Sequence, residues 1–295
     1  MVIPLPDPSC GASCHGPRAS VSAALIAVLL SGCSINLGSL TPASDEEPAK
    51  LASPSNLASL TETIRNNPND AKAYSRRGAL LAQAGKTDDA LADVNKAIGL
   101  DSNYGPAYAN RGLIYRQTRR LDLAIADYER AIALDANDAS AYLGRGLVYK
   151  ARNQPEQALT DFNKTIALAP DNAEAYYNRG LLYQSEQQHQ YAIADFTAAS
   201  GLVPQQADPL LARAQSNLAL DKTREAAADL DEAVQLEPQN AQAWVTRGLA
   251  YERIGDKTKA ASSFSRAIAL RPKDETARTG FARVGGKSGQ TYDTF

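Results

Sequence analysis

The sequence predicts an all-α fold made of six consecutive helix–turn–helix units, and three observations lead to this prediction. Residues 71–274 align with themselves at a spacing of 34 residues without a gap, which is the sign of a repeat architecture. Small residues recur at fixed positions of the units, with large apolar residues beside them. Proline recurs at the thirty-second position of four units, namely Pro170, Pro204, Pro238 and Pro272.

The small residues are expected to mark the place where the two helices of a unit cross. Antiparallel helices approach closely only where the facing side chains are small. Position 8 is Gly in five units and Ala in the fifth unit, and position 20 is Ala in all six. Gly85 and Gly255 indicate that the first helix ends near position 15, because glycine accepts a positive φ there. The prolines predict where the second helix ends.

The units divide the chain into a long central array with a short segment at each end. We expect the units at residues 71–104, 105–138, 139–172, 173–206, 207–240 and 241–274. Residues 56–70 are interpreted as the second helix of a degenerate earlier unit, and residues 275–284 as a capping helix. A cap is needed because the last unit otherwise exposes an apolar face to water. Residues 285–295 are expected to be a disordered tail.

This pattern resembles the tetratricopeptide-repeat (TPR) family. The resemblance implies a right-handed α-solenoid whose first helices line a concave groove that binds proteins or peptides. The groove positions that it implies are 2, 5, 6, 9, 12 and 13 of each unit. The candidate groove residues are Leu113, Leu147, Leu181, Leu249, Tyr177, Asn110, Asn178, Arg116 and Lys150. The alternative is that these leucines are simply buried between the helices.

An Arg–Asp ladder runs through the array. Position 7 is Arg in all six units: Arg77, Arg111, Arg145, Arg179, Arg213 and Arg247. Position 23 is Asp in five: Asp93, Asp127, Asp161, Asp195 and Asp229. A planar guanidinium bonds a carboxylate through two nitrogens, so ion pairs that support helix packing are the simplest interpretation.

The direction of this ladder is open from the sequence, since pairing within units and pairing between units both give five pairs. The sixth unit has Ser263 at position 23, and the capping segment has Phe281 where the next Arg would stand. Acid and base are thus lost together, which favours pairing between units. Ser59, in the place of a partner for Arg77, counts against it. We predict pairing between units, Arg111 with Asp93 and Arg145 with Asp127.

The N-terminal segment has the features of a bacterial lipoprotein leader. Residues 21–30, VSAALIAVLL, have the length of a signal-peptide apolar region and are too short to span a bilayer. Leu30-Ser31-Gly32-Cys33 resembles the lipobox, which implies a signal peptide over residues 1–32, an acylated Cys33 and a flexible tether over residues 33–55. The alternative is a free cysteine after an apolar stretch, and the long, weakly charged start raises the question of the true start codon.

Composition argues against several functions. The formal net charge is −2 and no basic face or polybasic run is present, which argues against nucleic acid and against an anionic membrane surface. Cys10, Cys14 and His15 lack a second pair of metal ligands and lie in the predicted leader. We find no phosphate loop, metal-ligand spacing or nucleophile elbow, so we expect neither a cofactor nor catalysis.

These observations predict a lipid-anchored, periplasmic adaptor of the cell envelope, with the outer membrane favoured because Ser34 and not Asp follows Cys33. Its partners are expected to be proteins or peptides, and its role to be envelope assembly or peptidoglycan remodelling. The alternative is a component of outer-membrane assembly or of an envelope secretion machinery. Both rest on resemblance to repeat-containing lipoproteins, since a fold alone does not fix a function.

Overall fold

The structure is a computed structural model that describes residues 54–286, and these residues form fourteen α-helices. The predicted signal peptide, Cys33, the predicted tether up to residue 53 and the predicted tail from residue 287 lie outside the described residues. The helices are α2 (Pro54–Asn66), α3 (Ala71–Gln83), α4 (Thr87–Leu100), α5 (Gly105–Gln117), α6 (Leu121–Leu134), α7 (Ala139–Ala151), α8 (Pro155–Leu168), α9 (Ala173–Ser185), α10 (His189–Leu202), α11 (Ala207–Ala219), α12 (Thr223–Leu236), α13 (Ala241–Ile254), α14 (Lys257–Leu270) and α15 (Glu275–Arg283).

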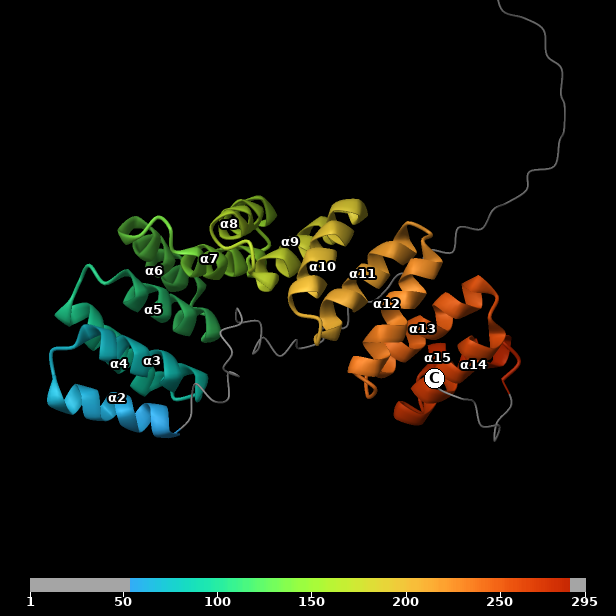
Figure 1. The fold of residues 1–295 in the computed structure, drawn as a ribbon, viewed down its shortest axis with the longest axis horizontal. Coiled ribbons are helices and arrows are strands. Elements are labelled where there is room, and N and C mark those ends of the chain that lie inside the picture. The colour runs from blue at the N-terminus through green and yellow to red at the C-terminus, as the bar shows by residue number, and fades with distance from the viewer. Residues whose placement is uncertain (1–53, 287–295) are drawn as a thin grey trace, which may run out of the picture. The chain divides into compact units, whose positions relative to one another are not determined.

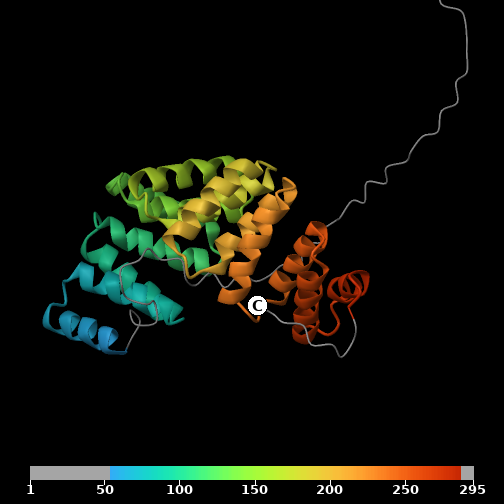
Figure 2. The ribbon, with the colours of Figure 1, turned by 45° about the vertical axis from the view of Figure 1, so that its right-hand side comes forward.

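The predicted α-solenoid of helix pairs is confirmed. The pairs from α3–α4 to α13–α14 correspond to the six units, and each pair packs against the next along the chain. Figure 1 shows this succession, and Figure 2 shows the same pairs side by side from a second direction. Helix α2 packs on α3, and α15 packs on α14, so a single helix covers each end of the array.

The crossing of the two helices in each unit depends on the small residues. The alanines at position 20 are fully buried in all six units. A Cβ atom added at Gly146 would lie 2.8 Å from the Phe162 ring, and one at Gly248 would lie 2.6 Å from the Phe264 ring. These distances are too short for carbon atoms, so glycine at position 8 is what allows the large residue at position 24 to pack against the first helix.

The turn inside each unit has the same backbone conformation in all six copies. The residue at position 15 adopts a positive φ in every unit, although only Gly85 and Gly255 are glycines. The other four are Arg119, Asn153, Gln187 and Asp221, with φ values between 57° and 62°. The left-handed conformation is strained for most side chains, so the packing of the two helices dictates this turn more than the residue at its apex does.

Candidate functional site

The Arg–Asp ladder pairs within units, so the predicted pairing between units is wrong. Nε and Nη2 of each of the first five arginines donate to the two carboxylate oxygens of the aspartate sixteen residues later in the same unit. Arg111 bonds Asp127 at 2.7 and 2.8 Å, and Arg145 bonds Asp161 at 2.9 and 2.8 Å. These ion pairs therefore join the two helices of one unit.

The ladder also extends between units, through a position that the sequence analysis did not identify. The third guanidinium nitrogen, Nη1, donates to position 25 of the preceding unit: Arg111 bonds Asn95 at 2.8 Å, and Arg179 bonds Asn163 at 2.7 Å. In the third unit the hydrogen bond with Asp161 raises the pKa of Arg145, and the charge of Glu129 at position 25 adds to this. The arginines that make both kinds of contact thus join three helices with one rigid group.

In the sixth unit the carboxylate partner and the neutral partner of the arginine change places. Ser263 stands in place of the aspartate and accepts a hydrogen bond from Arg247 Nη1 at 2.7 Å. The carboxylate partner of Arg247 is Asp231, at position 25 of the fifth unit, 2.6 Å from Nε. Within the ladder, the ion pair that runs between units therefore occurs where the position-23 carboxylate is missing.

Aromatic rings enclose most of the ladder arginines. Side chains at positions 4 and 11 lie on the same side of the first helix as position 7. The guanidinium of Arg145 lies 5.7 Å from the ring centres of both Tyr142 and Tyr149. Such contacts stabilise a cation and shield it from water, so we assign the ladder a structural role.

The candidate groove residues lie on first helices. Those from α3 to α11 form a row in which each contacts the next, and Leu249 lies beyond this row, on α13. Leu113, Leu181, Leu249 and Tyr177 are half-buried, so part of each remains accessible. Leu147 is 7% exposed and packs with Leu143 and Leu182. It contributes packing and little open surface, while the other apolar candidates keep the accessibility that a groove requires.

Polar side chains bridge neighbouring helices in this row. Asn110 Nδ2 donates to Ser75 Oγ at 2.9 Å, which links α5 to α3. Lys150 Nζ donates to Asn178 Oδ1 at 2.7 Å, which links α7 to α9. Gln184 donates to Ser216 Oγ at 2.9 Å, which links α9 to α11. These bonds fix the spacing of the first helices and so the shape of the surface they form.

A cluster of charged groups lies in the middle of this row, and we call Arg116, Tyr128, Lys150, Glu174 and Asn178 the polar cluster. Tyr128 reaches it from α6: burial raises the pKa of Tyr128 to about 12, although the charge of Arg116 and a hydrogen bond with it act in the opposite direction. Asn178 is buried and donates to the Glu174 carbonyl at 2.8 Å. Three first helices and one second helix therefore bring these polar groups to one place.

Burial weakens both charges at the centre of the polar cluster. It raises the pKa of Glu174 from 4.5 to about 7, although the charges of Arg116 and Lys150 act in the opposite direction. It lowers the pKa of Lys150 from 10.5 to about 8, although the charge of Glu174 opposes this. Perturbed pKa values of this kind gather at functional sites, and Arg116 Nε is buried there without a hydrogen-bond partner among the described residues.

Three members of this cluster, Arg116, Lys150 and Asn178, were predicted from the sequence as separate groove candidates. Glu174 and Tyr128 were not among the predicted groove residues. Glu174 stands at position 2, one of the implied groove positions, and that was the available signal. Tyr128 stands at a core position, so only the adjacent Gly144, which leaves room for its ring, pointed to it.

The described residues offer no sign of metal or membrane-span chemistry. Among residues 54–286, His, Cys, Asp and Glu side chains form no group of three or more that could hold a metal ion. No helix in this part of the chain combines the length and the apolar character that crossing a membrane requires.

Stacked helix pairs with a continuous row of first helices define the class of protein as a helical-repeat scaffold for protein–protein interaction. Family models described as "TPR repeat" match residues 112–152 and 146–187, and models described as "Tetratricopeptide repeat" match residues 57–105, 173–205 and 211–275. The chain therefore belongs to the tetratricopeptide-repeat family, whose fold is typically a scaffold without enzymatic activity. No curated protein sequence matches the chain.

Several solved structures share the fold. The structure from the work on Pseudomonas aeruginosa pilF has a TM-score of 0.65 at 21% identity and covers 72% of this chain and 97% of its own. YrrB, described as a TPR protein with an unusual peptide-binding site, has a TM-score of 0.51 at 24% identity and covers 63% of this chain and 96% of its own. MamA has a TM-score of 0.53 at 25% identity, with 57% and 92% covered.

Proposed function

We propose that this chain is a lipid-anchored adaptor on the periplasmic side of the cell envelope, and that it binds protein partners on the row of first helices during envelope assembly or peptidoglycan remodelling. The polar cluster is the observation that supports a binding surface there most directly. Charged groups held at a half-buried surface, with Leu113 and Leu181 on neighbouring helices, suit a peptide that brings both apolar and polar side chains.

The polar cluster contains groups whose charges and hydrogen-bonding capacity are not fully satisfied within the chain. The polar cluster retains charge at the expense of desolvation, and Arg116 Nε has no hydrogen-bond partner. Arg116 as a whole is half-buried, so a carboxylate of a partner can approach the accessible part of its side chain. A hydrogen bond to a charged group of this kind contributes about 1.5–3 kcal/mol. YrrB, with its peptide-binding site, is a precedent for binding by this fold.

Polar substitution on the first helices is expected to remove the partner without unfolding the chain. In Leu113→Gln and Leu181→Gln, a half-buried leucine of the row is replaced. Partner capture after crosslinking in cells, followed by mass spectrometry, should fall about tenfold or more if these side chains fill partner pockets. Urea denaturation checks that each variant stays folded.

The matched control is Leu123→Gln on α6, because Leu123 is 49% exposed and belongs to a second helix. This variant should capture partners as the wild type does. If folded Leu113→Gln and Leu181→Gln also capture partners normally, the row of first helices is not the binding surface. The nature of the captured proteins separates peptidoglycan remodelling from the alternative of outer-membrane assembly or secretion.

The lipid anchor gives a separate prediction. Cys33→Ala is expected to move the chain from the membrane fraction to the soluble fraction, since acyl chains on Cys33 are the proposed attachment and several chains together anchor a protein firmly. Fractionation of cells and immunoblotting measure this, with Cys10→Ala and Cys14→Ala as controls within the predicted leader. If Cys33→Ala fractionates with the membrane as the wild type does, the proposed anchor is wrong.

A further inference from the structure

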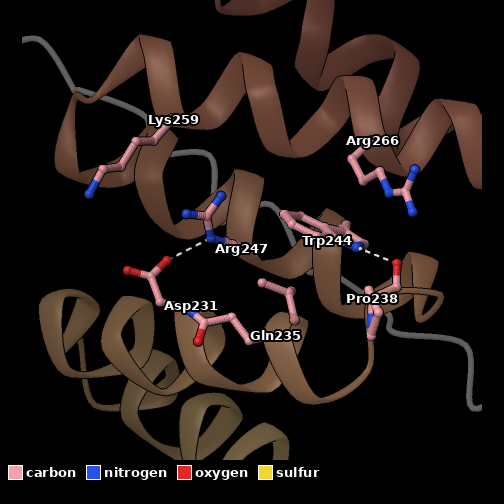
Figure 3. Close-up of a pocket in the computed structure, with 8 residues that line it drawn as sticks. Asp231, Gln235, Pro238, Trp244, Arg247, Lys259 and Arg266 are labelled. Carbon is pink, nitrogen blue, oxygen red and sulfur yellow. Dashed lines mark hydrogen bonds and ion pairs between the residues drawn. The ribbon is translucent and has the colours of Figure 1, made fainter. Parts of the chain in front are cut away.

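The described residues contain a charged cavity outside the row of first helices, between α12, α13 and α14. Its volume is about 720 Å³. Figure 3 shows Lys259 at one end of it, Arg266 at the other, and Arg247 and Trp244 between them. Asp231 and Gln235 enter from α12. None of these residues belongs to the polar cluster.

The charge of this cavity is unbalanced. Arg247, Lys259 and Arg266 contribute three cations, and Asp231 is the one carboxylate among the lining residues. Asp231 is already engaged, because it accepts hydrogen bonds at 2.6 Å from both Arg247 and Tyr251. The hydrogen bond with Tyr251 raises the pKa of Lys259, and the charges of Asp231 and Asp256 add to this. Neither Lys259 nor Arg266, however, forms an ion pair with a carboxylate of the described residues.

The two remaining cations are available to a ligand. Arg266 is half-buried and makes no hydrogen bond or ion pair with any residue that the structure describes. Lys259 is exposed and holds the Tyr251 hydroxyl at 3.2 Å, with its ammonium 4.8 Å from the ring centre. An ammonium has three donors, so Lys259 keeps two for another acceptor.

The first unit supplies an internal comparison. A smaller cavity of about 350 Å³ lies at the corresponding place between α2, α3 and α4. There Arg77 and Lys86 face Asp89 and Asp93, so the charges balance. Asp89 stands at the position that Lys259 occupies in the sixth unit, and Asp93 stands where that unit has Ser263. The imbalance is therefore a property of the sixth unit and not of the repeat fold.

We propose that this cavity binds an extended acidic peptide segment with two carboxylates separated by two residues. Lys259 and Arg266 are seven residues apart on α14, which places their backbone positions about 10 Å apart along the helix. In a polyproline II segment, which has three residues per turn and rises about 3.1 Å per residue, a residue and the third one after it lie on the same side, about 9 Å apart. One carboxylate meets Lys259, the other meets Arg266, and the intervening residues lie over Arg247 and Trp244.

Trp244 makes the site directly measurable, because it is the single tryptophan of the chain. Its Nε1 is committed to the Pro238 carbonyl at 3.0 Å, while Arg247 lies 5.5 Å from its ring. A bound peptide changes the electric field and the solvation around this ring. Binding is therefore followed by tryptophan fluorescence, with isothermal titration calorimetry on the full-length chain as a second measurement.

The probe is a capped eight-residue peptide with two glutamates separated by two residues, and its counterparts are the same peptide with two glutamines and one with adjacent glutamates. We expect saturable binding of the first peptide, at least about tenfold weaker binding of the glutamine form, and a loss of affinity with salt. Arg266→Gln should weaken binding about tenfold, and Arg266→Lys should restore most of it.

The matched control is Lys96→Gln, because Lys96 stands at the same repeat position in the first unit, where the charges balance. It should leave the affinity unchanged, as should Leu181→Gln on the row of first helices. Equal binding of the glutamine peptide, an unchanged affinity in Arg266→Gln, or no binding by either measurement overturns the proposal. Equal affinity for inorganic phosphate shows a general anion site and overturns it too.

Discussion

Asp161→Ala is expected to lower the free energy of unfolding by about 3 kcal/mol, because it leaves Arg145 without a carboxylate inside the third unit. The Asp161 side chain is 2% exposed and that of Arg145 is 19% exposed. Breaking a buried ion pair by removing one member costs about 3–5 kcal/mol. We place this variant at the lower end, because water reaches part of the guanidinium. Urea denaturation followed by circular dichroism measures the change.

The matched control is Asp122→Ala. Asp122 pairs with Arg152 at 2.8 Å, but its side chain is 87% exposed. Exposed ion pairs contribute about 0–1 kcal/mol, so this variant should be almost as stable as the wild type. Equal large losses in the two variants would show that burial does not govern the strength of these ion pairs. A loss near zero in Asp161→Ala would remove the structural role that we assign to the ladder.

Most of the fold could be predicted from the 34-residue period of the sequence. Gly146 and Ala158, the small residues at positions 8 and 20 of the third unit, lie at a helix crossing, as their spacing predicted. Local chemistry was less informative at the turns. Arg119 and Gln187 adopt the same left-handed conformation as Gly85, because the packed helices impose it, and nothing in those two residue types indicates it.

The pairing direction of the ladder could have been predicted from the positions of its residues beside the helix crossing. Position 7 adjoins the glycine at position 8, and position 23 adjoins the large residue that packs on that glycine. Arg145 and Asp161 are therefore neighbours of the Gly146–Phe162 contact within one unit. Counting pairs could not decide the direction, because both schemes give five pairs. The missing carboxylate of the sixth unit did not indicate pairing between units throughout, because only Arg247 takes its carboxylate partner, Asp231, from the preceding unit.

The polar cluster could be predicted only in part, because it has no period. Position 2 carries a different residue in each of the six units, and only the fourth unit has Glu there. Arg116, Lys150 and Glu174 come from three successive units, so their meeting depends on how the first helices stack. A pattern that repeats every 34 residues indicates the core, whereas a site that occurs once requires the coordinates.

The free energy of unfolding is expected to fall as the pH rises towards neutrality, because Glu174 is buried. Burial raises the pKa of Glu174 from 4.5 to about 7, so the folded chain holds this proton more tightly than the unfolded chain does. The stabilisation is complete below about pH 4.5 and is lost as the pH rises through about 7. Since one pKa unit corresponds to about 1.4 kcal/mol, the loss from this group approaches about 3 kcal/mol.

Lys150 affects the dependence of the free energy of unfolding on pH at higher pH values. Its pKa is lowered from 10.5 to about 8, so its contribution is present above about pH 10.5 and is lost as the pH falls through about 8. The two groups together place a minimum of stability between about pH 7 and pH 8. The charges of Arg116 and Lys150 act on Glu174 from α5 and α7, and burial outweighs them.

Comparison of wild type with Glu174→Gln tests this directly. In urea denaturation at pH 5 and pH 7.5, the wild type should lose about 2 kcal/mol more between the two values than Glu174→Gln does, because glutamine has no proton to release. Glu156→Gln on α8 is the control, since Glu156 is an exposed glutamate, and it should follow the wild type. If wild type and Glu174→Gln instead run parallel between pH 5 and 7.5, the carboxyl of Glu174 is not desolvated and the polar cluster is solvated at neutral pH.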